Sequence, residues 1–251
     1  MKQLEDAVRA CHGDVVAETL GVPTRSIGWK IEMGHYHACE SVQILKRAIY
    51  DSDVIADNEH EAIAASKAIL LSAVGHASAP PLNDARVRAE AHMIAAAQSL
   101  HSTADIMASV AYWALDFPCR TNPPREHRLN LYQVRKHLQY DPDCAEITNS
   151  ITNFVDLHQF KYLTGYVNTT KHRSLVGVQY SAHTDPRDNP RQGLRIRAFQ
   201  YRDGVGNIHS YDQIWGEDFL FSEAQLIRDG ILTIGNSLNR YFANTTSDIV
   251  T

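Results

Sequence analysis

The sequence lacks the cysteine patterns, leader segments and long apolar runs that mark secreted, metal-binding or membrane proteins. Its 251 residues include only four cysteines, which form no C-x-x-C pair and no metal-type spacing: Cys11, Cys39, Cys119 and Cys144. Scattered cysteines of this kind are typical of buried thiols in a reducing compartment. The N-terminus carries charges where a signal peptide needs apolar residues, and no stretch is long enough to span a bilayer. We therefore expect a cytoplasmic protein with no membrane partner, cofactor or bound metal.

An overall excess of positive charge is also absent. The formal net charge is -5, so no global basic field attracts nucleic acid, and any such binding must be local. The hydrophobic content of 44% is that of an ordinary globular protein with an ample core. No internal repeat, long low-complexity segment or clear boundary divides the chain. The sequence therefore predicts a single domain over residues 1–251.

Helical periodicity dominates the chain up to about residue 173. Apolar residues recur at helical spacing in six segments, at residues 4–20, 38–50, 57–77, 83–116, 129–138 and 141–173. Gly21 with Pro23 is expected to end the first of these helices, and the segment from 83 to 116 contains neither glycine nor proline. A helix of that length is expected to be central. Residues 26–38 have no clear pattern, and His35 and His37 would share the face of a strand, which is a weak metal signal.

The apolar period changes from about 3.6 to 2 after Arg173. Three extended runs, at residues 174–184, 194–202 and 207–215, are joined by the turn-forming segments D-P-R-D-N-P-R-Q-G and D-G-V-G. A last helix is expected over 222–242, followed by frayed residues. The predicted fold is mainly α, a helical bundle formed by residues 1–173 and 222–247. A small antiparallel β-sheet or hairpin, residues 174–216, is inserted before the C-terminal helix.

The most informative stretch runs from Tyr162 to Val176. Asn168 and His172 are four residues apart and fall on one helix face, with Lys171 beside them and Arg173 at the end. A histidine between two cations and near an amide can bind a phosphate, and a histidine with a near-neutral pKa can move a proton. The alternative is structural, since cations in a last helical turn favour the helix dipole and His172 could satisfy a carbonyl.

Basic residues are concentrated between positions 171 and 202. This segment contains seven basic residues against two aspartates; the basic residues are Lys171, Arg173, Arg187, Arg191, Arg195, Arg197 and Arg202. Arg195 and Arg197 are expected to share one face of a strand. The alternative is a solvated sheet face, because edge strands often carry charges that prevent further pairing.

A second histidine lies within the long central helix. His101 and Asp105 are spaced four residues apart on a small and apolar stripe, so the pair is expected to be partly buried. The carboxylate would orient the ring and raise its pKa. Alternatively, the pair only fixes the packing of the helix. A metal site made by His101, Asp105 and His172 is a third possibility, although helical bundles usually build such sites from paired Glu-x-x-His motifs.

The helix that reads H-M-I-A-A-A-Q-S-L-H-S-T-A-D-I and the later segment N-T-T-K-H-R-S-L resemble the HEPN superfamily of helical-bundle proteins. Many of these are metal-independent ribonucleases of toxin, abortive-infection and CRISPR-linked defence systems. Their signature is an arginine, often followed by a polar residue, with a histidine four to six residues later. V-N-T-T-K-H matches the polar residue at Asn168 and the histidine at His172, while Val167 stands at the position of the arginine. The resemblance covers roughly residues 83–173.

The resemblance implies attack of a ribose 2′-hydroxyl on its own phosphodiester. His172 would be the general base or acid, Lys171 and Arg173 would stabilise the developing charge, and Asn168 would position the phosphate. His101 and Asp105 would line the cleft, and HEPN proteins commonly form homodimers. The basic strand would follow RNA phosphates through Arg187, Arg191, Arg195 and Arg197. The competing hypothesis is a non-catalytic helical scaffold or adaptor that dimerises or binds a partner protein.

Overall fold

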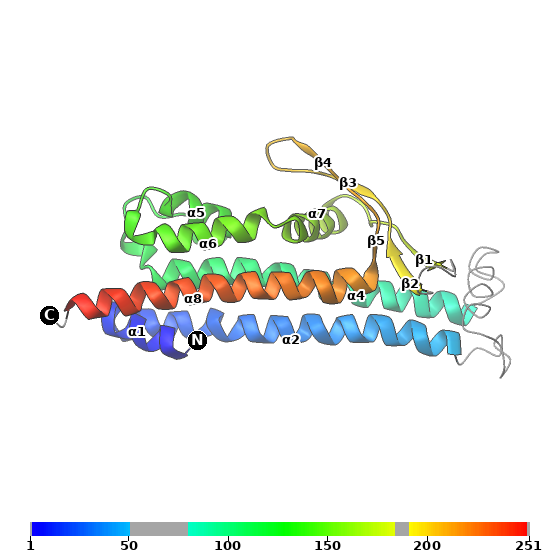
Figure 1. Cartoon of the computed structure of the whole chain (residues 1–251), viewed down its shortest axis with the longest axis horizontal. Helices are drawn as coiled ribbons and strands as arrows, with labels where there is room; N and C mark the ends of the chain where they lie inside the picture. The colour runs from blue at the N-terminus through cyan, green and yellow to red at the C-terminus, as the bar shows by residue number, and fades with distance from the viewer. Residues whose placement is uncertain (1, 51–79, 184–190, 250–251) are drawn as a thin grey trace. The chain divides into compact units, whose positions relative to one another are not determined.

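The structure is a computed structural model that describes residues 2–50, 80–183 and 191–249 (Figure 1). Its helices are α1 Lys2–His12, α2 Asp14–Tyr50, α4 Pro80–Ala114, α5 Leu131–Leu138, α6 Ala145–Asp156, α7 His158–His172 and α8 Ala224–Ile249. Short 3-10 turns cover Phe117–Cys119, Glu126–Arg128 and Pro142–Cys144, and a π-helical turn covers Asp218–Glu223. The strands are β1 Val178–His183, β2 Arg191–Ile196, β3 Phe199–Arg202, β4 Ile208–Tyr211 and β5 Ile214–Trp215. The predicted fold class, mainly α with a small antiparallel β-sheet or hairpin before the last helix, is confirmed. The helix predicted over 57–77 lies outside the described residues.

The predicted helix end at Gly21 and Pro23 is wrong. The first break comes earlier, at Gly13, whose φ of 86° is a left-handed conformation that favours glycine. Helix α2 then continues through Pro23 to Tyr50. Buried residues before and after the proline fall on one stripe of the helix: Ala17, Leu20, Thr24 and Ile27. Burial of this continuous stripe outweighs the lost backbone hydrogen bond, so the local breakers do not end the helix.

The chain groups into two compact units. The first contains residues 1–32, 99–163 and 224–251, and the second contains residues 33–98 and 164–223. Helices α2, α4 and α7 each contribute residues to both units. The single domain expected over residues 1–251 therefore stays a prediction.

The first unit is helical, with α8 packed against α1 and α6, and α6 packed against α5 (Figure 1). Gly230 of α8 lies so close to the ring of Phe154 that no side chain fits there. The helix predicted over 141–173 is divided at Leu157, where a ψ of 131° separates α6 from α7. The residues expected to fray after 242 remain helical to Ile249. The largest buried side chains of this unit include Leu4, Leu20, Met107, Phe117, Leu138, Ile147, Ile151, Phe154, Leu163 and Phe242.

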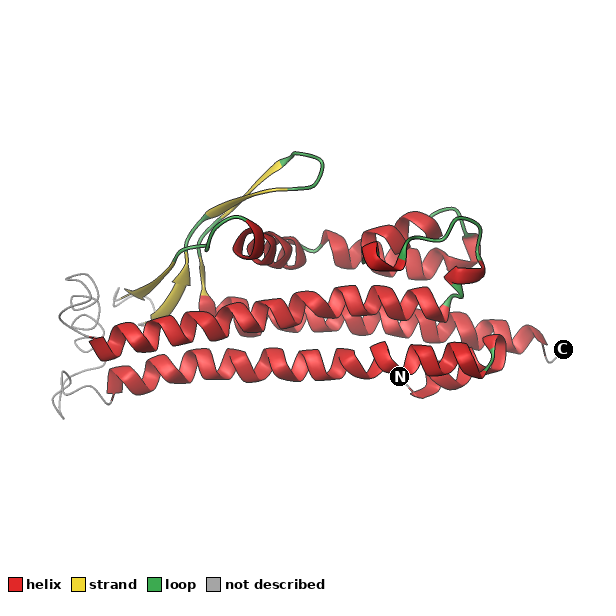
Figure 2. Ribbon diagram, turned by 180° about the vertical axis from the view of Figure 1, so that it is seen from behind, coloured by secondary structure: helices red, strands yellow, loops and turns green. Residues whose placement is uncertain are grey.

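The second unit contains two sheets where the sequence predicts one. Strands β1, β2 and β5 form an antiparallel sheet in that order, and β3 pairs with β4 in a separate hairpin. Figure 2 shows the β3–β4 hairpin lying over α7. The run predicted over 194–202 is divided because Arg197 and Ala198 lie outside both ladders, so β2 and β3 enter different sheets.

No helix within the described ranges has the length and apolar character to cross a bilayer.

Candidate functional site

The β3–β4 hairpin packs directly on α7. A Cβ at Gly165 would stand 2.6 Å from Cε2 of Tyr211 and 3.4 Å from Cβ of Tyr201, so only glycine allows this approach. The rings of Tyr166 and Phe199 meet edge to face, with centroids 6.2 Å apart. Five residues, two from the helix and three from the hairpin, therefore hold the two elements together near the last turns of α7.

Asn168 continues the helix face that the hairpin covers. Its Nδ2 lies 3.4 Å from the hydroxyl oxygen of Tyr201, to which it donates a hydrogen bond. Gly165, Asn168 and His172 are separated by three and four residues, so they share one stripe of α7. His172 and Lys171 are exposed in the last turn, one turn beyond Asn168. The predicted histidine is thus presented to solvent on the stripe that faces the hairpin.

Arg173 is anchored to the hairpin. Its Nη2 donates a hydrogen bond of 2.8 Å to the carbonyl oxygen of Arg202, and its guanidinium carbon lies 5.8 Å from the centroid of the Tyr201 ring. A cation over an aromatic face is an attractive arrangement. Tyr201 therefore joins two of the predicted site residues, Asn168 and Arg173, to the hairpin.

The hairpin adds a histidine that the sequence analysis missed. Tyr201 and His209 are partners across β3 and β4, and their rings are stacked with centroids 6.3 Å apart. His209 Nε2 lies 3.0 Å from Asp203 Oδ2, and Asp203 Oδ1 accepts hydrogen bonds from two backbone amides, those of Val205 and Asn207. The hydrogen bond from His209 is the main cause of a pKa of Asp203 well below its usual range. The only sequence signal was the D-G-V-G turn, whose register places Tyr201 opposite His209.

These side chains form one exposed polar surface, which we call the α7–hairpin surface. It consists of Lys171, His172, Arg173, Tyr201, Arg202 and His209, all at least partly exposed. Arg202 contributes its backbone carbonyl to Arg173, and its Nη1 lies 3.3 Å from the carbonyl oxygen of Gly206 in the hairpin turn. The surface therefore combines three fixed cations with two histidines and a tyrosine.

The strand arginines have different surroundings from one another. The guanidinium carbon of Arg195 lies 5.2 Å from the centroid of the Trp215 ring, and its Nε is buried without a hydrogen-bond partner. Arg197 is exposed, and its Nε donates a hydrogen bond of 2.9 Å to Oε1 of Gln179. Gln179 is also the ladder partner of Arg195, so the two arginines lie on the same face, as expected. Arg197 is the more accessible of the two cations.

The other two arginines expected to bind RNA are Arg187 and Arg191. Arg191 is the first residue of β2, but its side chain is outside the described part of the structure. Arg187 lies outside the described residues altogether. Their expected role in binding RNA stays a prediction.

His101 and Asp105 belong to the first unit. His101 is half-buried and stacks on Phe160 with ring centroids 6.1 Å apart, while Asp105 is exposed. Nδ1 of the histidine lies 3.9 Å from Oδ2 of the aspartate, which is an ion-pair distance rather than a hydrogen-bond distance. The expected partial burial therefore holds for the histidine alone. Because His172 belongs to the second unit, a joint role of the three residues stays a prediction.

The two histidines predicted to share a strand face lie instead on α2 and point in different directions. His37 Nδ1 is 2.9 Å from Nδ1 of His92 on α4, whereas His35 Nε2 is 3.6 Å from the sulfur of Cys39. Burial and the neighbouring His92 lower the pKa of His37. In the ranges that the structure describes, no three His, Cys, Asp or Glu side chains gather closely enough to hold a metal ion.

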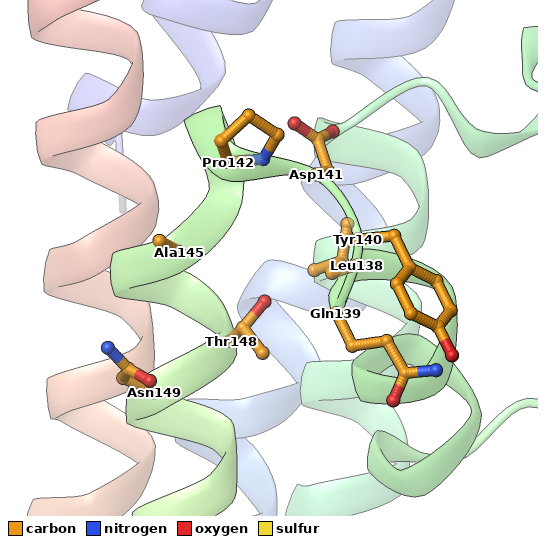
Figure 3. Close-up of a pocket in the computed structure, with 8 residues that line it drawn as sticks. All are labelled: Leu138, Gln139, Tyr140, Asp141, Pro142, Ala145, Thr148 and Asn149. Carbon is orange, nitrogen blue, oxygen red and sulfur yellow. The ribbon is translucent and has the colours of Figure 1, made fainter.

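A small pocket in the first unit contains none of the predicted site residues. It has a volume of about 260 Å³ and lies where α5 ends and α6 begins (Figure 3). Its lining residues are Leu138, Gln139, Tyr140, Asp141, Pro142, Ala145, Thr148 and Asn149. Asp141 is held by Arg120, whose Nη1 lies 2.9 Å from Oδ2 of the carboxylate. This ion pair ties the loop after α4 to the start of α6, so the aspartate has a structural partner.

No family model, no curated protein and no solved structure matches this chain.

Proposed function

We propose that the protein binds RNA through the α7–hairpin surface and cleaves it without a metal ion. The observation that supports this proposal is the exposed run of Lys171, His172 and Arg173 beside a hairpin that carries a stacked tyrosine and histidine. Cations bind the phosphates of a nucleic acid, and aromatic rings stack on its bases. On the basis of the resemblance to HEPN proteins, we further propose that the protein acts in a toxin or antiphage defence system.

Binding rests on local charge. The chain as a whole is acidic, with a formal net charge of -5. RNA is therefore attracted by the α7–hairpin surface and by Arg197 of the same unit rather than by the whole protein. Each phosphate that a lysine or arginine neutralises releases counterions, so the affinity falls steeply as salt rises.

Cleavage uses the imidazole of His172. The neutral ring accepts the proton of a ribose 2′-hydroxyl, and the 2′-oxygen forms a bond to the adjacent phosphorus. The bond from phosphorus to the 5′-oxygen breaks, and that oxygen takes a proton from water, which leaves a 2′,3′-cyclic phosphate and a 5′-hydroxyl. Lys171 and Arg173 stabilise the negative charge that develops on the phosphorane. Asn168 holds the Tyr201 ring in place.

The test separates binding from cleavage. Binding of a fluorescein-labelled single-stranded RNA is measured by anisotropy at 50 and 200 mM salt, and cleavage of total RNA is measured in EDTA. We expect Lys171→Ala to weaken binding by about three- to tenfold and to reduce its salt dependence by about one phosphate contact. Lys136→Ala is the matched control, because Lys136 is an exposed lysine of α5 in the first unit. His172→Ala should keep binding and lose cleavage.

Three outcomes would refute the proposal or part of it. Equal RNA affinity of the Lys171→Ala and Lys136→Ala variants would exclude the α7–hairpin surface as the binding site. Cleavage by His172→Ala at the rate of the unmodified protein would exclude the catalytic role. If the unmodified protein neither binds nor cleaves RNA, the scaffold hypothesis replaces this one.

A further inference from the structure

Helix α2 exposes a regular row of large apolar side chains within the first unit. Val15, Val22 and Trp29 are 78%, 61% and 68% exposed. They are spaced by seven residues, which is close to two helical turns, so their directions differ by only about 40° over about 21 Å of helix. The buried stripe of the same helix, which includes Leu20 and Ile27, points elsewhere. We call the three exposed side chains the α2 stripe.

A row of this kind is a feature of interfaces. Single exposed apolar residues are ordinary, but an aligned set that ends in a tryptophan marks a surface that becomes covered. Tryptophan is enriched among the residues that dominate binding energy. The surroundings of the α2 stripe indicate which partner covers it.

The polar side chains on one flank of the α2 stripe can be buried in an interface without losing their hydrogen bonds. Thr19 and Ser26 lie on this flank, and each hydroxyl donates a hydrogen bond to its own helix. Thr19 Oγ1 bonds to the carbonyl oxygen of Val15 at 2.8 Å, and Ser26 Oγ bonds to that of Val22 at 2.9 Å. Covering them leaves no hydroxyl donor unpaired, and their small size permits a close approach. Thr19 and Ser26 are uncharged and favour helix packing, and the charge on this flank is Lys30 near its far end.

The other flank carries Glu18 and Arg25, both exposed. These two residues are also seven apart and lie on the same side of the α2 stripe. A two-fold axis through Val22, perpendicular to the helix, reverses the direction of a second α2 but keeps this flank against its own equivalent. Glu18 then lies beside Arg25 of the second copy, displaced by one residue, or about 1.5 Å along the axis. The charges are self-complementary, which a symmetric interface requires.

The parallel arrangement lacks this match. A two-fold axis along the helices would place the charged flank against Thr19 and Ser26 of the other copy, where no opposite charge faces Glu18 or Arg25. The antiparallel arrangement also places Trp29 over Val15 of the second copy and Val22 over its own equivalent. In the single chain, Arg25 points toward Gly21 and Glu5: its Nη1 and the Oε2 of Glu5 lie 3.1 and 3.6 Å from the position that a Cβ on Gly21 would take. Arg25 therefore changes rotamer to reach Glu18 of the second copy.

We propose that two copies of this chain associate through the α2 stripe, with the two α2 helices antiparallel and Val22 on the two-fold axis. Trp29 is the main anchor, and Glu18 with Arg25 sets the orientation. This interface is separate from the α7–hairpin surface and does not depend on RNA.

Disulfide cross-linking tests the orientation. The exposed and half-exposed cysteines are first replaced by Cys11→Ser, Cys39→Ser and Cys119→Ser, while the buried Cys144 is kept. Val15→Cys and Trp29→Cys chains are then oxidised separately and as a mixture. We expect a cross-linked dimer only from the mixture, because antiparallel pairing places position 15 opposite position 29. A dimer formed by Val15→Cys alone would show a parallel pair and overturn the proposal.

Sedimentation velocity without RNA tests the interface itself. We expect a dimer that Trp29→Glu weakens by about 30-fold or more, as for the loss of a dominant anchor residue. Leu232→Glu is the matched control, because Leu232 is a 51% exposed leucine of α8 in the same unit. Glu18→Arg should weaken the dimer, and the double variant Glu18→Arg with Arg25→Glu should restore it.

A monomer at 100 μM, or no rescue by the charge exchange, would overturn the proposal. A monomer whose Trp29 fluorescence shifts on addition of anionic lipid vesicles would assign the α2 stripe to a membrane surface instead. Each of these results leaves the RNA proposal standing, since the RNA assays use other variants.

Discussion

Gly165→Ala tests the contact between α7 and the β3–β4 hairpin. Replacing an interior helical glycine by alanine normally stabilises a protein by about 1 kcal/mol, because alanine restricts the unfolded chain and favours the helix. At this position the new Cβ would stand 2.6 Å from Cε2 of Tyr211, whereas carbon atoms in contact are normally about 3.5–4.0 Å apart. The buried ring would have to move by about 1 Å.

The cost of that movement exceeds the gain in helix propensity. Overpacking a buried site typically costs about 1–3 kcal/mol. Displacing Tyr211 also disturbs its packing on Phe199, where the ring centroids are 5.1 Å apart and such a pair contributes about 0.5–1.5 kcal/mol. We therefore expect Gly165→Ala to lower the free energy of unfolding by about 1–2 kcal/mol.

Gly28→Ala is the matched control. Gly28 lies inside α2, and a Cβ there would meet no atom within 4 Å. The helix propensity and the effect on the unfolded chain are the same in both variants, so the difference between them isolates the contact with the hairpin. Urea unfolding followed by far-UV circular dichroism should place Gly28→Ala above the unmodified protein and Gly165→Ala below it, with a difference of about 2–3 kcal/mol. Equal stabilisation by both changes would refute the packing of the hairpin on α7.

Two further predictions concern pH and a half-buried ion pair. The pKa of His37 is lowered by burial and by His92, so the folded protein resists protonation below the ordinary value of 6.5. The neutral His37 ring therefore makes its full contribution to the free energy of unfolding above about pH 6.5, and this contribution falls as the pH decreases below that value. In thermal melts between pH 7.5 and 5.0, the melting temperature of His37→Gln should depend less on pH than that of the unmodified protein. Arg120→Ala should cost about 1–3 kcal/mol in urea unfolding, because Asp141 loses its charged hydrogen-bond partner at 2.9 Å. Arg128→Ala, at an exposed arginine, should change the stability by about 0.5 kcal/mol or less, and equal effects of the two changes would contradict the role of the pair.

Local patterns in the sequence were sufficient for most of the secondary structure. The long helix α4 and the change from helices to strands after Arg173 were both predicted from apolar spacing and turn residues. The break expected at Gly21 and Pro23 was wrong because burial of a continuous stripe kept α2 helical. The division of the predicted sheet at Arg197 was missed, since strand propensity does not report which strand is the partner.

For the candidate site, too, the sequence predicted the local arrangement but not the contacts between distant segments. The spacing of Asn168, Lys171 and His172 placed them on the last turns of a helix, as the structure has them. No pattern in the sequence connected Asn168 or Arg173 to Tyr201, which lies about thirty residues further along the chain.

The sequence by itself determined where helices and strands form and which of their faces are apolar, because these properties depend on neighbouring residues within a few turns. Only the tertiary structure decided that Tyr201 and His209 join the end of α7, that His37 meets His92, and that the α2 stripe is left exposed. Contacts between distant segments depend on the packing of all the elements at once, so short-range patterns cannot specify them.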